Sequence, residues 1–97
     1  ENAPSMQAVA AGAVVAGTVT INTGIVVAAD SEVIPILTGA VTGSTNFGSF
    51  RELKSSRVNG IAGVGTVVIE AVGADGAKDV DAAAASGVVR VVILTPQ

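Results

Sequence analysis

The acidic side chains are the residues of this sequence best suited to chemistry, because they gather in two short stretches. Asp75, Asp79 and Asp81 could surround a hard cation such as Ca²⁺, which binds several oxygen ligands. The spacing of a calcium loop, which needs a glycine and a later glutamate, is not present. Asp30 and Glu32 are two residues apart and would share one side of a strand, where two acids repel each other. We expect solvated acids in both stretches and no metal site.

The parts of a nucleophilic active site are missing from the chain. Ser and Thr are plentiful, but there is no His and no Cys, so a catalytic serine would need a lysine base. Neither Lys54 nor Lys78 follows a serine at the spacing that such pairs use. Gly60, Gly63 and Gly65 have a spacing like that of a dinucleotide-binding loop, but such a loop opens a helix and a β-branched run follows here. We therefore predict no catalytic residues, no cofactor and no enzymatic activity.

Two phenylalanines, Phe47 and Phe50, are the only aromatic residues of the sequence. Large rings often anchor an interface, since they bury much area at a small cost in conformational entropy. We interpret both rings as candidates for filling an apolar pocket of a neighbouring subunit. The alternative is that they fill the protein's own core, and either role makes them stabilising.

The stretch around these rings is also the basic part of the chain. Arg51, Lys54 and Arg57 recur every third residue, so on a helix they would lie along one broad face and could pair with acids of an adjacent subunit. Ser49 and Glu52 have the spacing of a capping box, which predicts a helical turn after Ser49. A solvated loop is the more common interpretation of such a basic run.

The chain is short, acidic and unusually apolar. It has 97 residues, a net charge of -3 and 49% hydrophobic but only 13% charged residues, against about 25% charged in ordinary soluble domains. This length fits one domain, and the negative charge argues against direct binding of nucleic acid. Val, Ala and Gly supply the hydrophobicity, and such small side chains bury little area each. We expect neighbouring subunits to supply part of the burial.

Residues 17–97 are interpreted as a single β-rich domain. Runs of β-branched residues between turn signals predict strands, the first two of which are joined as a hairpin. The predicted strands cover residues 18–21, 25–28, 32–38, 66–72 and 88–95. Pro35 lacks a backbone donor, which places its strand at a sheet edge or a bulge. Arg90 is expected to point to water or to pair with an acid such as Glu70 on a facing strand, and the pair is favoured. An inward charge that opposes edge pairing is the alternative. The Ala-rich residues 77–86 favour a short helix.

Residues 1–16 are expected to form an extended N-terminal arm. Pro4 removes a backbone donor, and the Ala/Val/Gly run that follows has no period that fixes it against the rest of the chain. Val9, Val14 and Val15 are therefore candidates for contacts with a neighbouring subunit. Polar residues interrupt the longest apolar region, and its uninterrupted part is too short for a bilayer, so no membrane span is expected.

Short strands and frequent turns predict an all-β fold, a small antiparallel sandwich or barrel-like domain with at most one or two helical turns. The Val/Ala/Gly-rich, aromatic-poor composition resembles that of small structural proteins of tailed-phage virions, such as capsid decoration or minor head proteins. The resemblance covers the whole chain as composition and involves no motif. It implies a virion protein that coats or cements a shell and binds copies of itself and other structural subunits.

Two other functions fit the same sequence. One is a subunit of an extracellular or cell-surface filament, like a pilus, in which residues 3–16 or 88–95 complete a neighbour's sheet by strand addition. The other is a monomeric module that binds carbohydrate or protein through loops such as residues 43–60. Sugar sites usually offer a stacking ring, and the chain has no Trp and no Tyr. The symmetry of the assembly, or a stable monomer, would separate the three functions.

Overall fold

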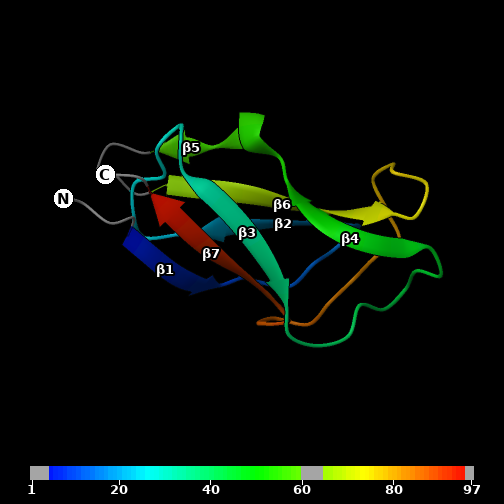
Figure 1. Ribbon diagram of the computed structural model, residues 1–97. Helices are drawn as coiled ribbons and strands as arrows, with labels where there is room; N and C mark the ends of the chain where they lie inside the picture. Colours follow the sequence, from blue (N-terminus) through cyan, green and yellow to red (C-terminus); the bar gives the residue numbers. More distant parts are fainter. Residues whose placement is uncertain (1–4, 60–64, 96–97) are drawn as a thin grey trace.

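The chain folds into two antiparallel sheets that pack face to face (Figure 1). The computed structural model describes residues 5–59 and 65–95. Sheet A has the strand order β1-β7-β3, and sheet B has the order β2-β6-β4 with β5 also beside β6. The elements are β1 (Ser5–Ala10), β2 (Thr18–Asn22), β3 (Glu32–Leu37), β4 (Phe47–Glu52), the 3-10 turn η1 (Lys54–Ser56), β5 (Val58–Asn59), β6 (Gly65–Gly73) and β7 (Val89–Thr95). The predicted all-β antiparallel fold is confirmed.

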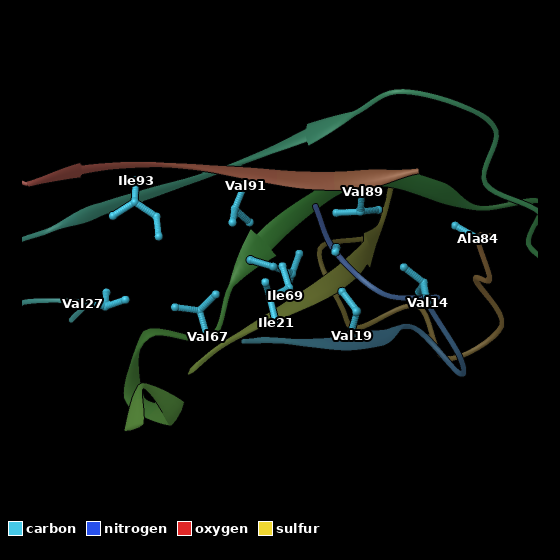
Figure 2. Packing of buried hydrophobic residues seen from close by; sticks show 11 residues of the cluster. Val14, Val19, Ile21, Val27, Val67, Ile69, Ala84, Val89, Val91 and Ile93 are labelled. Carbon is cyan, nitrogen blue, oxygen red and sulfur yellow. The ribbon is translucent and has the colours of Figure 1, made fainter. Parts of the chain in front are cut away.

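The core lies between the two sheets and is built from small β-branched side chains, which Figure 2 shows pointing toward one another. Successive side chains of a strand point to opposite faces, so every second residue faces inward. The inward residues of the three main strands are Val19 and Ile21 from β2, Val67 and Ile69 from β6, and Val89, Val91 and Ile93 from β7. This alternation determines which face of each sheet meets the other sheet and which is turned outward.

Residues 1–16, expected as an arm, contribute a strand of sheet A in their described part. β1 pairs with β7 along its whole length, beginning with Ser5 opposite Thr95. Ala11 and Val14 follow the strand and are buried in the core. The segment therefore has a partner inside the chain. The sequence did not reveal this partner, because the pairing joins residues that are far apart along the chain.

A tight turn between Val15 and Thr18 carries the chain from sheet A to sheet B, and the backbone groups of these two residues exchange hydrogen bonds of 3.2 Å. Both central residues have left-handed backbone angles, with φ 52° at Ala16 and φ 79° at Gly17, as a two-residue hairpin turn requires. A Cβ at position 17 would lie 2.1 Å from the carbonyl oxygen of Asp79. Glycine is therefore needed both for the angle and for the close packing on the segment between β6 and β7.

The predicted hairpin over residues 18–28 is wrong. β2 pairs with β6 instead, and residues 25–28 form no strand. Thr23 accounts for the change of direction, since its buried hydroxyl lies 2.7 Å from the carbonyl oxygen of Gly65 and 2.9 Å from that of Ile25. The chain is thereby turned toward β3 and sheet A.

The predicted helix over residues 77–86 is also wrong. This segment forms isolated β-bridges, Val14 with Ala84 and Thr42 with Ala83, and Ala84 is buried. Helix propensity is a weak preference that tertiary contacts override. Here the neighbouring segments take the backbone hydrogen bonds that a helix would have used.

Candidate functional site

Exposed apolar side chains gather on the outward face of sheet A. Ile34 and Ile36 of β3 are 43% and 42% exposed, and the register places them beside Val92 and Arg90 of β7. Val92 and Leu94 are turned to the same side and are half-buried. We call Ile34, Ile36, Val92 and Leu94 the apolar face. The apolar face is contiguous and partly exposed, so it is a candidate contact surface.

One charged residue lies at each end of the apolar face. Glu32 is opposite Leu94, and Arg90 is opposite Ile36; both charged residues are exposed. The two ends are four residues apart along a strand, which corresponds to about 13 Å. Among the described residues, neither Glu32 nor Arg90 takes part in an ion pair. The face is therefore apolar in the middle, acidic at one end and basic at the other.

The predicted pair of Arg90 with Glu70 is wrong, because the two residues belong to different sheets. Glu70 of β6 lies opposite Arg51 of β4, and Arg51 Nε is 3.3 Å from Glu70 Oε1. Thr18 and the exposed Thr20 are the outward residues of β2 on the other side of β6. On the outward face of sheet B, polar side chains thus flank the central strand on both sides.

The open edge of β3 is blocked by a proline. The amide of Thr38 donates to the carbonyl oxygen of Val88 at 2.7 Å, and bonded and non-bonded pairs alternate along an antiparallel ladder. Pro35 is three residues before the bonded Thr38, so it is a position that makes no hydrogen bond to β7. Its backbone nitrogen is therefore turned away from β7, toward the open edge. It has no N-H to offer there, which opposes the addition of a further strand. The prediction that Pro35 lies on an edge strand is confirmed.

The open edge of β1 carries no such block. The amide of Ala11 donates to the carbonyl oxygen of Val89 at 2.9 Å, so the alternation turns the backbone groups of residues 6, 8 and 10 away from β7. None of these three residues is a proline. Of the described strands, only β7 pairs with β1. The two edges of sheet A therefore differ in their capacity to accept another strand.

Arg57, a candidate for contacts with another subunit, is engaged inside the chain. Its Nε and Nη2 donate to the two carboxylate oxygens of Glu52 at 2.6 and 2.8 Å, and each side chain is only 8% exposed. The same guanidinium donates to the carbonyl oxygens of Ala28 at 2.6 Å and Ser31 at 2.7 Å. The hydrogen bond to Glu52 raises the pKa of Arg57 above its ordinary value. Arg57 thus ties the residues after β4 to the loop that leads into β3.

The three basic residues predicted to share a helix face are separated. Arg51 lies in β4, and Lys54 is exposed in η1. A helical turn follows Glu52, but the predicted capping box does not form, because Ser49 and Glu52 both lie in the strand. Leu53 is the residue before the turn, and no side chain caps it.

A bulge in β4 turns both phenylalanines to the inward side of sheet B. The register shifts between Phe47 and Ser49, and Phe50 lies opposite the buried Ala71. The two ring centroids are 4.9 Å apart and the rings are tilted by 54°. Gly48 permits the bulge, since a Cβ there would lie 3.3 Å from backbone atoms at the end of β6. Both rings are half-buried, and Phe50 packs against the protein's own core.

The three valines proposed for subunit contacts lie in different surroundings. Val14 is buried in the core and Val9 is half-buried against it. Val15, in contrast, is 70% exposed at the start of the turn into β2. Of the three, Val15 alone presents most of its side chain to the outside.

The acids between β6 and β7 organise the backbone around them. Asp79 is buried and accepts a hydrogen bond from the Ser44 hydroxyl, and its Oδ1 accepts another from the amide of Asp81 at 3.2 Å. Asp75 accepts from the amide of Ala77 at 3.2 Å. Among the described residues there is no group of three possible metal ligands and no pocket.

Asp30 and Glu32 are both exposed. Gly60 and Gly63 lie outside the described residues, and Gly65 begins β6. In the described part of the chain, no helix is long and apolar enough to cross a membrane.

The apolar face was not among the sites expected from the sequence, although one signal for it exists. Residues 91–94 are apolar at even and odd positions alike, and a strand that is apolar on both sides is typical of a sheet covered on both faces. The structure covers one of these faces with sheet B and leaves the other outward. No family model, curated protein or solved structure matches this chain.

Proposed function

We propose that this protein is a non-enzymatic structural subunit of a large assembly, and that the assembly is a virion shell which it decorates or completes. The observation that carries the proposal is the apolar face, which leaves Ile34 and Ile36 more than two-fifths exposed on a regular sheet. The composition, which resembles that of capsid decoration and minor head proteins, points to the virion.

Physical chemistry supports a covered state of this face. Each Å² of apolar surface removed from water contributes roughly 25 cal/mol. The core is built from valine, alanine and isoleucine, which gain less from burial than larger side chains do. Covering the apolar face against another subunit adds stability that the isolated chain lacks. Strands that are rich in β-branched residues suit a structural subunit that packs against other subunits.

The test is to locate the protein in its native assembly. Particles purified from the native source are labelled with gold-conjugated antibodies against the chain and viewed by negative-stain electron microscopy. Closed shells that carry the label support the proposal. Label only on soluble, unassembled material would overturn it.

A matched pair of variants ties the result to the apolar face. Ile36→Lys places a charge on this face, and Asn22→Lys places the same charge on the outward side of sheet B. The Ile36→Lys chain should be lost from the shells while the Asn22→Lys chain is retained. Equal retention of both would mean that another surface makes the contact.

A second candidate function, a filament built by strand addition, is favoured by the unblocked edge of β1. Residues 88–95 cannot be donated to a neighbour without dismantling sheet A, because β7 is its middle strand. β1 is an edge strand, so it could leave its own β7 and pair with that of a neighbour.

Engineered cysteines distinguish the two functions, because the native chain has none. Ala8 and Val92 are partners in the register, and facing positions of this kind lie within the Cα distance of a disulfide. In the chain that carries Ala8→Cys and Val92→Cys, a disulfide within one chain in assembled material supports the shell subunit. Disulfide-linked ladders between chains would support the filament.

A further inference from the structure

We infer that the apolar face binds the same face of a second copy of this chain, about a two-fold axis that lies between the faces and runs across the strands. The inference rests on the proposed function, since it assigns a partner to the face on which that function depends. Figure 1 shows the three strands of sheet A side by side, and on their outward side Ile34 and Ile36 of β3 are exposed beside the half-buried Val92 and Leu94 of β7.

The placement of charge on the face is the reason for choosing a second copy. Glu32 lies at the Leu94 end and Arg90 at the Ile36 end. A two-fold axis across the strands exchanges these ends, so it brings the acid of each copy beside the base of the other. Both ion pairs form at once, because the contact is the same on the two copies.

Other arrangements of two copies do not use the charges in this way. A two-fold axis along the strands keeps each end over the same end of the partner, so it leaves Glu32 near Glu32 and Arg90 near Arg90. Edge-to-edge pairing through β3 meets Pro35, which turns a position without an N-H to the open edge. The arrangement with the two-fold axis across the strands buries the apolar middle of the face and also pairs the charged residues at its ends.

The middle of the face would then pack around the axis. Ile34 and Val92 are register partners halfway between the charged ends. The axis passes close to this pair, so Ile34 of one copy would lie against Ile34 of the other. A position beside its own symmetry mate is sensitive to charge, because a charged side chain there would face an identical charge.

The size of the face predicts a weak association. Three strands about 4.8 Å apart and five or six residues long cover roughly 300 Å² per copy, well below the approximately 800 Å² per partner of a standard stable interface. We therefore expect dissociation constants in the micromolar to millimolar range for the chain alone. In a shell, many such contacts act together, so a weak single contact is sufficient.

The test exchanges the charges one at a time and then together, with self-association measured by sedimentation equilibrium from micromolar to millimolar concentration. Glu32→Arg and Arg90→Glu each place like charges across the interface, and each should weaken association about tenfold or more. The double variant Glu32→Arg/Arg90→Glu restores opposite charges on both sides and should recover wild-type association. Asp30→Arg and Lys78→Glu make the same changes of charge at exposed positions outside the face and should have little effect.

Thermal unfolding of dilute protein shows whether each variant is folded. Glu32 contributes to the electrostatic environment of Arg57, so the milder Glu32→Gln and Arg90→Gln variants provide a second series in which association should weaken less. A folded double variant that fails to recover association would overturn the two-fold contact, and so would a wild-type chain that stays monomeric throughout. Label on native shells would still support the proposed function in both cases, so the two ideas can fail separately.

Discussion

The outward faces of the two sheets are made from similar strands but differ in what covers them. On sheet B the middle strand is partly covered by the chain itself: Val72 is buried and bridges to Lys78, and Glu70 is ion-paired with Arg51. On sheet A the outward side of the middle strand carries Val92 and Leu94, and no described segment lies over it. The outward face of sheet B is thus partly covered by the protein's own side chains, whereas the outward face of sheet A keeps Ile34 and Ile36 exposed.

The edge strands follow the same division. β2 turns the polar residues Thr18, Thr20 and Asn22 outward. β3 turns Glu32, Ile34 and Ile36 outward, so two of its three outward residues are apolar. A strand with one face in water normally alternates apolar and polar residues. β2 follows this rule and β3 departs from it, and for this reason we propose sheet A as the contact surface.

The largest expected effect is a loss of stability when the link between β4 and the loop before β3 is removed. Arg57→Ala removes a guanidinium that joins Glu52 to the loop before β3, and it leaves a nearly buried carboxylate without its partner. We expect the free energy of unfolding to fall by about 3–5 kcal/mol, measured by urea denaturation at a concentration where the chain is monomeric.

Arg51→Ala is the matched control, because the Arg51 side chain is half exposed and makes a single contact of 3.3 Å to Glu70. This change also leaves the nearly buried Glu70 without its partner, so we expect a smaller loss of about 1–3 kcal/mol. The hydrogen bond to Glu52 raises the pKa of Arg57, so the contribution of Arg57 to stability is fully present below its unfolded-state pKa and is lost only as the pH rises beyond its folded-state pKa. Titration of Arg57 itself therefore changes nothing between about pH 6 and pH 9. Equal losses for the two variants would show that Arg57 does not connect the sheets.

The next effect concerns association. Ile34→Arg places a charge at the middle of the apolar face, and Thr20→Arg places the same charge on the outward side of β2. The first should weaken self-association by at least tenfold, or about 1.4 kcal/mol, and the second should leave it unchanged. Sedimentation velocity at high concentration measures both. A larger effect from Thr20→Arg would move the contact surface to sheet B and reverse the comparison.

The smallest effect concerns the turn that joins the two sheets. Ala16 has a left-handed backbone angle, φ 52°, which is unfavourable for alanine and favourable for asparagine before glycine. Ala16→Asn should raise the free energy of unfolding by about 0.5–1 kcal/mol without changing association, as measured by thermal unfolding and sedimentation. Ala13→Asn, an exposed change outside the turn, is the control and should not stabilise the protein.

Much of the fold could be predicted from the sequence because strands are local patterns. The runs that became β2, β3, β6 and β7 were expected near their observed positions, since β-branched residues between turn signals identify strands without knowledge of their partners. The edge position of Pro35 followed from its missing donor in the same way. The residue type alone carried the information in these cases.

The rest depended on contacts that local patterns do not contain. Arg51, Lys54 and Arg57 were all candidates for contacts with another subunit, yet the chain buries the last of them and exposes the other two. The alanines of residues 77–86 have helix propensity, but bridges to Val14 and Thr42 decide their conformation. The apolar face was missed because only the pairing of β3 with β7 brings its four residues together.

The pairing of Ser5 with Thr95 has a consequence for how the molecule is made. Of the described strands, β7 leaves the ribosome after all the others, and both other strands of sheet A pair with it. Proteins in which distant residues must meet fold slowly, in milliseconds to seconds. Sheet B can form first, because its paired strands lie closer together along the sequence. Sheet A, with its outward face, is completed only after β7 has been synthesised. The surface we assign to assembly therefore does not exist on the unfinished chain.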